Sequence, residues 1–132
     1  MSERSLSYVE VEMLLSRLYR ALDASDPDAL AACFTDEAIW HRPDGPKTGT
    51  DAIRTVATDR AANRATSHIP SNLIVEQVGE ELVAQYYLTV YEHVEGEQAR
   101  LFACLDCEDR LTKSGDGLKL VDKRAHMRMK FA

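Results

Sequence analysis

The second half of the chain alternates apolar and polar residues with a period of two, from residue 69 to residue 131. This is the period of β-strands, in which successive side chains point to opposite faces. Turn residues interrupt the alternation three times, which predicts four long strands over 69–78, 82–94, 99–113 and 118–130. Short turns between long strands predict an antiparallel meander, and strands of this length form a sheet that twists and curls.

The first half of the chain is predicted to be mainly helical. A capping-box pattern at Ser7 and leucines at helical spacing predict a first helix that ends at Asp23. Asp26 in front of Pro27 predicts a short second helix. A third helix is expected over about 51–63, and a short strand around Trp40 precedes it.

Three helices ahead of a curled antiparallel sheet predict an α+β fold. With 132 residues, the chain is expected to form a single domain over 1–132. Helices that close one end of a curled sheet enclose a cone, and a small apolar molecule would lodge there.

The net charge and the composition of the chain restrict which binding partners and which cellular compartment we expect. The formal net charge of −6 argues against nucleic acid and against an anionic membrane, because both require a basic surface. No apolar run approaches the length of a membrane span, and the polar N-terminus is unlike a signal peptide. The three cysteines favour a reducing compartment, so we expect a cytoplasmic protein. Cys104 and Cys107 point to opposite faces of one strand and predict no metal site.

Asp109 is the most informative polar residue of the strands. It has the same parity as the apolar residues Leu105, Cys107 and Leu111, where an ionised carboxylate is costly unless it is paired or functional. Two interpretations stay open: Asp109 has a structural role, in which it caps a neighbour or pairs with Arg124 or Lys123, or it acts in a pocket. The basic residues of that last strand are interpreted as a solvated face: Lys119, Lys123, Arg124, Arg128 and Lys130.

Three stretches carry a resemblance to a known superfamily: Tyr19-x3-Asp23-x2-Asp26, Phe34-Thr-Asp-Glu-Ala38 and Gly49-Thr-Asp-Ala-Ile53-Arg54. Together with the order of elements, they resemble the nuclear transport factor 2-like superfamily over nearly the whole chain. Within it, the chain looks closest to the SnoaL-like proteins and the scytalone dehydratase branch. The resemblance implies a cone-shaped curved sheet with three N-terminal helices. It specifies the fold better than the chemistry, because this fold hosts isomerases, dehydratases, cyclases and non-catalytic subunits.

The resemblance also implies site residues. Asp23 matches an aspartate at the end of the first helix of the dehydratase branch, and His68 matches its catalytic histidine; the two form a dyad there. His93 lies within one residue of a second active-site histidine. Against ketosteroid isomerase, Tyr19 and Asp109 match the two oxyanion-hole donors, whereas the general-base aspartate of that enzyme falls on Arg42, which argues against its mechanism.

These residues suit acid–base chemistry without a cofactor or a metal. In this hypothesis His68 is the base and acid, Asp23 orients it, and Tyr19 with Asp109 donates to a carbonyl oxygen. The expected reaction is that of a dehydratase or isomerase acting on a small, hydrophobic, oxygenated molecule, for which a cyclic skeleton is expected. The pocket is expected to be lined by Trp40, His41, Tyr87, His93 and Met127.

The alternative hypothesis is a non-catalytic module of the same fold that binds a ligand or assembles subunits, as the β subunit of ring-hydroxylating dioxygenases does. An exposed face of the sheet predicts a homodimer in either case. The histidine at position 68 has a structural interpretation as well, because a histidine between a helix and a sheet commonly bonds a nearby carbonyl.

Overall fold

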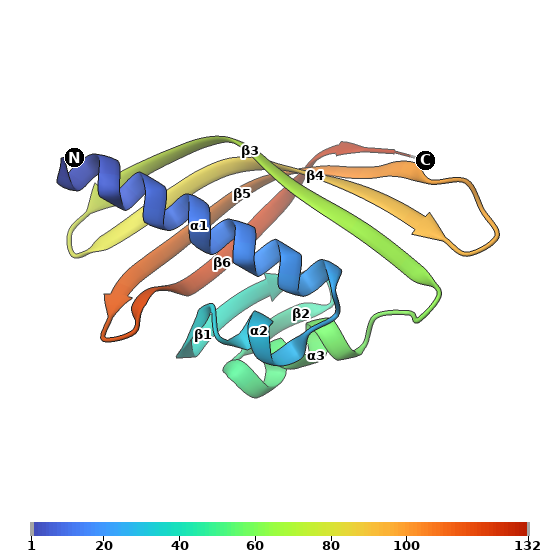
Figure 1. The fold of residues 1–132 in the computed structure, drawn as a ribbon, viewed down its shortest axis with the longest axis horizontal. Helices are drawn as coiled ribbons and strands as arrows, with labels where there is room; N and C mark the ends of the chain where they lie inside the picture. The colour runs from blue at the N-terminus through green and yellow to red at the C-terminus, as the bar shows by residue number, and fades with distance from the viewer. Residues whose placement is uncertain (1, 132) are drawn as a thin grey trace.

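The computed structural model describes residues 2–131, and residues 1 and 132 of the expected domain lie outside this part. Three helices and six strands form in it (Figure 1). The helices are α1 (Glu3–Asp23), α2 (Pro27–Ala31) and α3 (Thr50–Thr58). The strands are β1 (Phe34–Arg42), β2 (Gly45–Thr48), β3 (Arg64–Val78), β4 (Glu81–Val94), β5 (Arg100–Ser114) and β6 (Gly117–Lys130).

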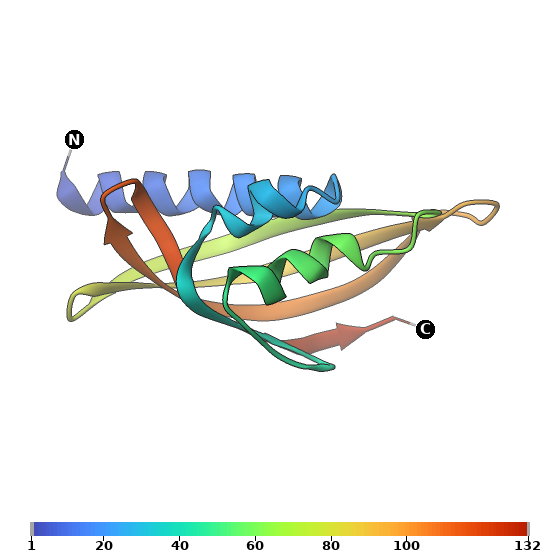
Figure 2. The same cartoon turned by 90° about the horizontal axis from the view of Figure 1, so that it is seen from below.

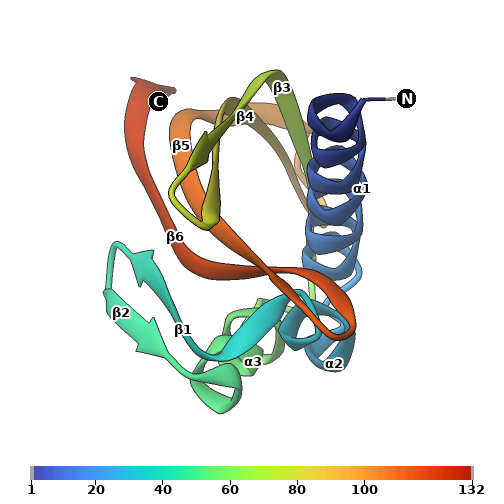
Figure 3. The same cartoon turned by 90° about the vertical axis from the view of Figure 1, so that its left-hand side faces the viewer.

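All six strands belong to one sheet with the order β2-β1-β6-β5-β4-β3. The four long strands form the expected antiparallel meander, whereas β1 pairs with β6 in parallel. Figure 3 shows the sheet curving from β3, next to α1, round to the β1–β2 hairpin. The helices lie on the concave side, which we call the inner face; the opposite side is the outer face (Figure 2). The expected α+β fold with a curved sheet and three N-terminal helices is confirmed.

The elements depart from the sequence expectations at their ends. Helix α1 begins at Glu3 rather than at Ser7, so the capping-box pattern lies inside the helix. Strand β3 begins at Arg64, which places His68 within a strand and not at a junction between helix and sheet. Pairing with β4 fixes this segment, because Arg64 lies opposite Val94 and His68 opposite Val90. Tertiary pairing of this kind overrides a weak local preference for strand.

The core lies between α1 and the inner face. Val11, Leu15 and Leu18 of α1 are almost fully buried, as the helical spacing of the apolar residues requires. From the sheet, Ala84 and Leu111 complete the same cluster. Among the described residues, no helix is long and apolar enough to cross a membrane.

Strand β6 contains a β-bulge that decides which of its residues face inward. Leu120 pairs with Leu111 of β5, but the next pair joins Asp122 to Arg110, so Val121 is an extra residue. The inward residues are even-numbered before the bulge and odd-numbered from Lys123 to Met127 after it; a second register shift, between Met127 and Met129, returns Met129 to the outer face. The bulge therefore turns Lys123 toward the inner face, where it pairs with Asp109 across the strands.

Candidate active site

The structure brings Asp23 and His68 into direct contact. The carboxylate oxygen Oδ1 of Asp23 lies 2.6 Å from Nδ1 of His68, and Oδ2 accepts the backbone N–H of His68 at 3.1 Å. The hydroxyl of Thr66 donates to Oδ1 at 2.9 Å. Asp23 ends α1, whereas Thr66 and His68 both point inward from β3, so one helix end and one strand build the pair. Because His68 lies within a regular strand, the pairing of the sheet fixes the position of its backbone.

The contact fixes the proton on one nitrogen of the imidazole ring. A carboxylate only accepts, so Nδ1 of His68 carries the hydrogen and donates it to Asp23. Partial burial raises the pKa of Asp23, but the hydrogen bonds from His68 and Thr66 outweigh it, and the pKa is lowered. Asp23 is thus held as an anion. In the described part of the chain, Nε2 of His68 has no hydrogen-bond partner, and the side chain keeps 12% of its exposure.

Tyr19 packs its ring against the imidazole of His68. The ring centroids are 5.6 Å apart and the planes are 10° from parallel. The ring thus limits the tilt of the imidazole while Asp23 fixes its rotation. Tyr19 itself is 2% exposed, so it forms a rigid support.

Tyr19 also belongs to a buried polar cluster of four residues, whose other members are Tyr86, Asp109 and Lys123. Lys123 donates to the hydroxyls of Tyr19 and Tyr86, at 2.6 and 2.7 Å, and to the carboxylate of Asp109, at 3.1 Å. Tyr86 donates to Asp109 at 2.6 Å. Because the hydrogen of Tyr86 is used in that bond, the 2.6 Å contact between the two tyrosines requires Tyr19 to donate to Tyr86. Every hydrogen of the cluster therefore has an acceptor within it.

The cluster holds the charge of Lys123 firmly, whereas burial raises the pKa of Asp109 against the opposing effects of Lys123 and Tyr86. Burial lowers the pKa of Lys123, but the carboxylate of Asp109 and the oxygen of Tyr19 outweigh it, so the pKa of Lys123 is raised. Burial raises the pKa of Tyr19, which remains a neutral phenol. Lys123 and Asp109 form an ion pair at 4% and 0% side-chain exposure.

The expected role of Tyr19 and Asp109 as donors to a substrate oxygen is therefore corrected. The hydroxyl hydrogen of Tyr19 is used by Tyr86, and Asp109 is an acceptor with no exposed surface. Of the two interpretations of Asp109, the pairing with a basic residue of the last strand holds, and the partner is Lys123. Interpreting Lys123 as part of a solvated face was wrong, because the bulge at Val121 turns it inward.

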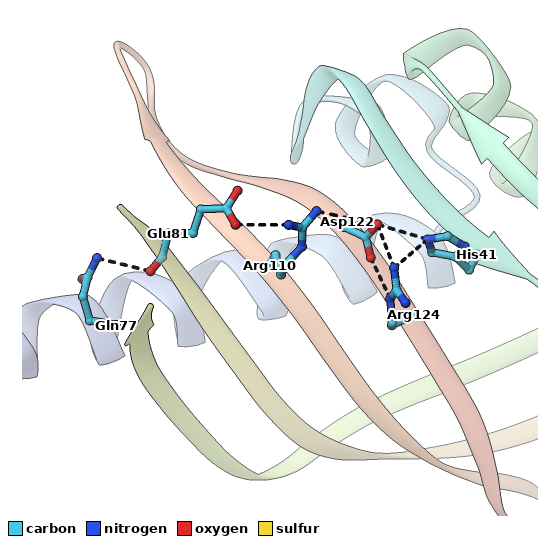
Figure 4. A network of polar contacts seen from close by, with 6 residues as sticks. All are labelled: His41, Gln77, Glu81, Arg110, Asp122 and Arg124. Atoms are coloured by element: carbon cyan, nitrogen blue, oxygen red, sulfur yellow. Dashed lines mark hydrogen bonds and ion pairs between the residues drawn. The ribbon is translucent and has the colours of Figure 1, made fainter. Parts of the chain in front are cut away.

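The five expected pocket residues separate onto two faces of the sheet. His41, Tyr87 and His93 lie on the outer face, so the expectation that they line the cavity is corrected. Figure 4 shows His41 joined to Asp122, which in turn contacts Arg124 and Arg110. The other two residues bond elsewhere: His93 contacts the carbonyl of Glu97, and Tyr87 stacks under Arg128.

Trp40 and Met127 lie on the inner face. Trp40 is buried and stacks on Phe34, with ring centroids 5.6 Å apart. Met127 points inward yet is 51% exposed, and Ala125 before it is also exposed. The helices thus leave uncovered the part of the inner face that β6 forms after Lys123. Two surface hollows lie along α1 at Glu3–Ser7 and Tyr8–Ser16, and neither is lined by Asp23 or His68.

Solved structures share this fold over nearly the whole chain. ActVI-ORFA from Streptomyces coelicolor has a TM-score of 0.82 and 21% identity, covering 92% of this chain and 96% of its own. Aln2 from a Streptomyces species has a TM-score of 0.84 and 22% identity, covering 96% and 93%. An NTF2-like protein with a cystatin-like fold from Novosphingobium aromaticivorans has a TM-score of 0.83 and 18% identity, covering 98% and 87%. At these identities the likeness establishes the fold.

No curated protein matches the chain by sequence. A family model does match, and it covers residues 3–124, which include both members of the Asp23–His68 pair. The resemblance to SnoaL-like proteins within the nuclear transport factor 2-like superfamily is thereby confirmed. The chain belongs to the SnoaL-like domain family.

Proposed function

We propose that the protein is a cofactor-free acid–base lyase or isomerase of the dehydratase type, acting on a small, hydrophobic, oxygenated molecule. One observation carries this proposal. His68 is fixed by Asp23 through Nδ1, while its Nε2 has no hydrogen-bond partner in the described residues and its side chain is 12% exposed. An oriented imidazole with one free basic nitrogen is the arrangement that general acid–base catalysis requires.

The proposed reaction uses that nitrogen twice. Nε2 of His68 removes the proton from the carbon next to a carbonyl, and the electron pair of the C–H bond forms a C=C bond. The hydroxyl on the neighbouring carbon leaves with the proton that Nε2 took, so that water is released. Asp23 stabilises the imidazolium that exists between the two transfers, because it remains an anion throughout. Isomerisation follows the same path when the proton returns to a different carbon.

The test uses a β-hydroxy ketone of the tetralone type, whose dehydration gives a fluorescent naphthol. We expect His68→Gln to lower the rate about a hundredfold or more, the usual contribution of general acid–base catalysis. Asp23→Asn should cause a smaller loss, since the imidazole remains but its tautomer is no longer fixed. His126→Gln is the matched control, because His126 lies on the outer face with a side chain 77% exposed.

Equal rates for His68→Gln, His126→Gln and the wild type would contradict the proposal. If the ketone binds but is turned over no faster than in buffer, the ligand-binding alternative replaces it. Melting temperatures of all variants separate loss of chemistry from loss of folding.

A further inference from the structure

Four arginines of the described chain are half-buried, and they fall into two classes. Arg54 pairs with Asp28 and Asp51, and Arg64 pairs with Glu92. Arg42 and Arg60 form no ion pair with any described carboxylate. Since a guanidinium that loses water without gaining a counter-ion is costly, the second class lacks a partner that the first class has.

Arg60 lies one hydroxyl group away from the Asp23–His68 pair. It follows α3, and its terminal nitrogen donates to the hydroxyl of Thr66, which in turn donates to Asp23. Among the side chains that the structure describes, its Nε is the one buried nitrogen or oxygen atom without a hydrogen-bond partner. A buried donor without an acceptor is rare in folded proteins and points to a group that binds there.

Arg42 stands at the end of β1 on the inner face. Its guanidinium lies 5.1 Å from the ring centroid of Trp40. Burial lowers the pKa of Arg42, and the positive charge of Arg64 lowers it further, against the effect of Asp44. The pKa of Arg60 is lowered in the same way, by burial and by the charges of Arg64 and Arg42, with only Asp23 opposing. The positive charges of these arginines thus act on one another. Arg60 follows the end of α3, and Figure 1 shows that this end lies near the end of α1 and the start of β3.

We propose that Arg42 and Arg60 form a binding site for a carboxylate group carried by the substrate of His68. The inference rests on the proposed function, because the carboxylate would hold the rest of the molecule beside Nε2 of His68. Guanidinium groups bind carboxylates through charge-assisted hydrogen bonds, and Nε is one of the donors used in such contacts. The substrate class becomes an oxygenated, largely apolar acid.

Arg42 and Arg60 are not explained as groups that neutralise the negative charge of Asp23. Asp23 already accepts three hydrogen bonds from Thr66 and His68, which use both of its oxygens. Arg60 reaches Asp23 only through Thr66, and Arg42 does not contact it. The described carboxylates at this end of the inner face therefore leave the positive charges of Arg42 and Arg60 without an ion-pair partner.

The experiment compares naphthylacetate with naphthylacetamide, which has the same shape without the charge. Dissociation constants are measured by calorimetry, and the Nε–H signal of Arg60 is followed by NMR. We expect naphthylacetate to bind about tenfold more tightly or better and to move the Arg60 signal downfield. Arg60→Gln and Arg42→Gln should each remove this preference. Arg54→Gln is the matched control, because it removes one charge from α3, the helix that Arg60 follows, but from an arginine with its own carboxylates.

Equal binding of acid and amide, or an acid preference unchanged in Arg60→Gln, would overturn the carboxylate site. That result leaves the proposed function standing if His68-dependent dehydration of the neutral ketone persists. The reverse result, carboxylate binding without His68-dependent turnover, removes the catalytic proposal and keeps the binding site. The two failures are therefore distinguishable.

Discussion

Asp23 accepts hydrogen bonds from both the side chain and the backbone of His68. The carboxylate consequently fixes the rotamer of the histidine as well as its tautomer. Both residues follow from the resemblance to the dehydratase branch, although they are 45 positions apart and no local pattern joins them. The third contact, from Thr66, was not predicted, because the sequence placed this segment outside the sheet. Once β3 is known to begin at Arg64, the two-residue spacing of Thr66 and His68 on one face suffices to find it.

The lowered pKa of Asp23 gives a prediction for stability against pH. A carboxyl group whose folded-state pKa lies below its ordinary value of 3.8 stabilises the fold above that pH. The contribution is lost as the pH falls through the folded-state pKa. We expect Asp23→Asn to cost about 1 kcal/mol near neutral pH, the usual scale of such hydrogen bonds, and progressively less in acid. Urea unfolding of both proteins across the acid range measures the difference.

The control is Asp116→Asn in the turn between β5 and β6, where the carboxylate is exposed. It should leave the free energy of unfolding unchanged at every pH. A gap between the wild type and Asp23→Asn that stays constant into acid would show that the carboxylate charge contributes nothing to folding.

The elements show where sequence reasoning succeeds and where it stops. The four long strands were predicted to within a few residues, except for the start of β3, because alternation and turn residues are local signals. Strand β2 and the parallel pairing of β1 with β6 were not predicted, since both depend on contacts between distant segments. Lys123 was misplaced for a related reason. A bulge changes the parity of a strand without any characteristic residue, and Val121 is an ordinary strand residue.

The buried ion pair behind the site gives a second prediction. Lys123→Met should destabilise the protein by about 3–5 kcal/mol, because the carboxyl group of Asp109 loses its counter-ion at 0% exposure and must either stay buried as an unpaired charge or take up a proton. The double variant Lys123→Met with Asp109→Leu should recover most of that loss, since no buried charge remains. Chemical denaturation of the wild type, the single variant and the double variant measures these differences in the free energy of unfolding. A double variant as unstable as Lys123→Met alone would mean that packing, not charge, determines the cost.

At the scale of the molecule, the outer face carries a row of side chains across four strands. Ile69, Thr89, Cys104 and Met129 are successive partners in the sheet, and the two at the ends are 48% and 45% exposed. Tyr91, 46% exposed, lies in the adjacent row. Exposed apolar surface on a sheet favours burial against another sheet.

We therefore expect a homodimer that buries this outer face. Ile69→Lys should shift the protein to a monomer, because the new charge would be desolvated in the interface. Sedimentation velocity measures the change. The comparison is Glu12→Lys on the exposed side of α1, which should leave the dimer intact. A wild-type protein that sediments as a monomer at all concentrations would exclude this association.

The uncovered inner face beyond Lys123 has a kinetic consequence. Enzymes that enclose their substrate must move a loop or a domain at each turnover, and that motion often sets the rate. Here Met127 and Ala125 of the inner face are exposed with every element in place, so in the proposed reaction no helix has to move before a substrate approaches this face. Entry and exit then depend on diffusion and affinity, and the slow step of a cycle would be the proton transfer itself.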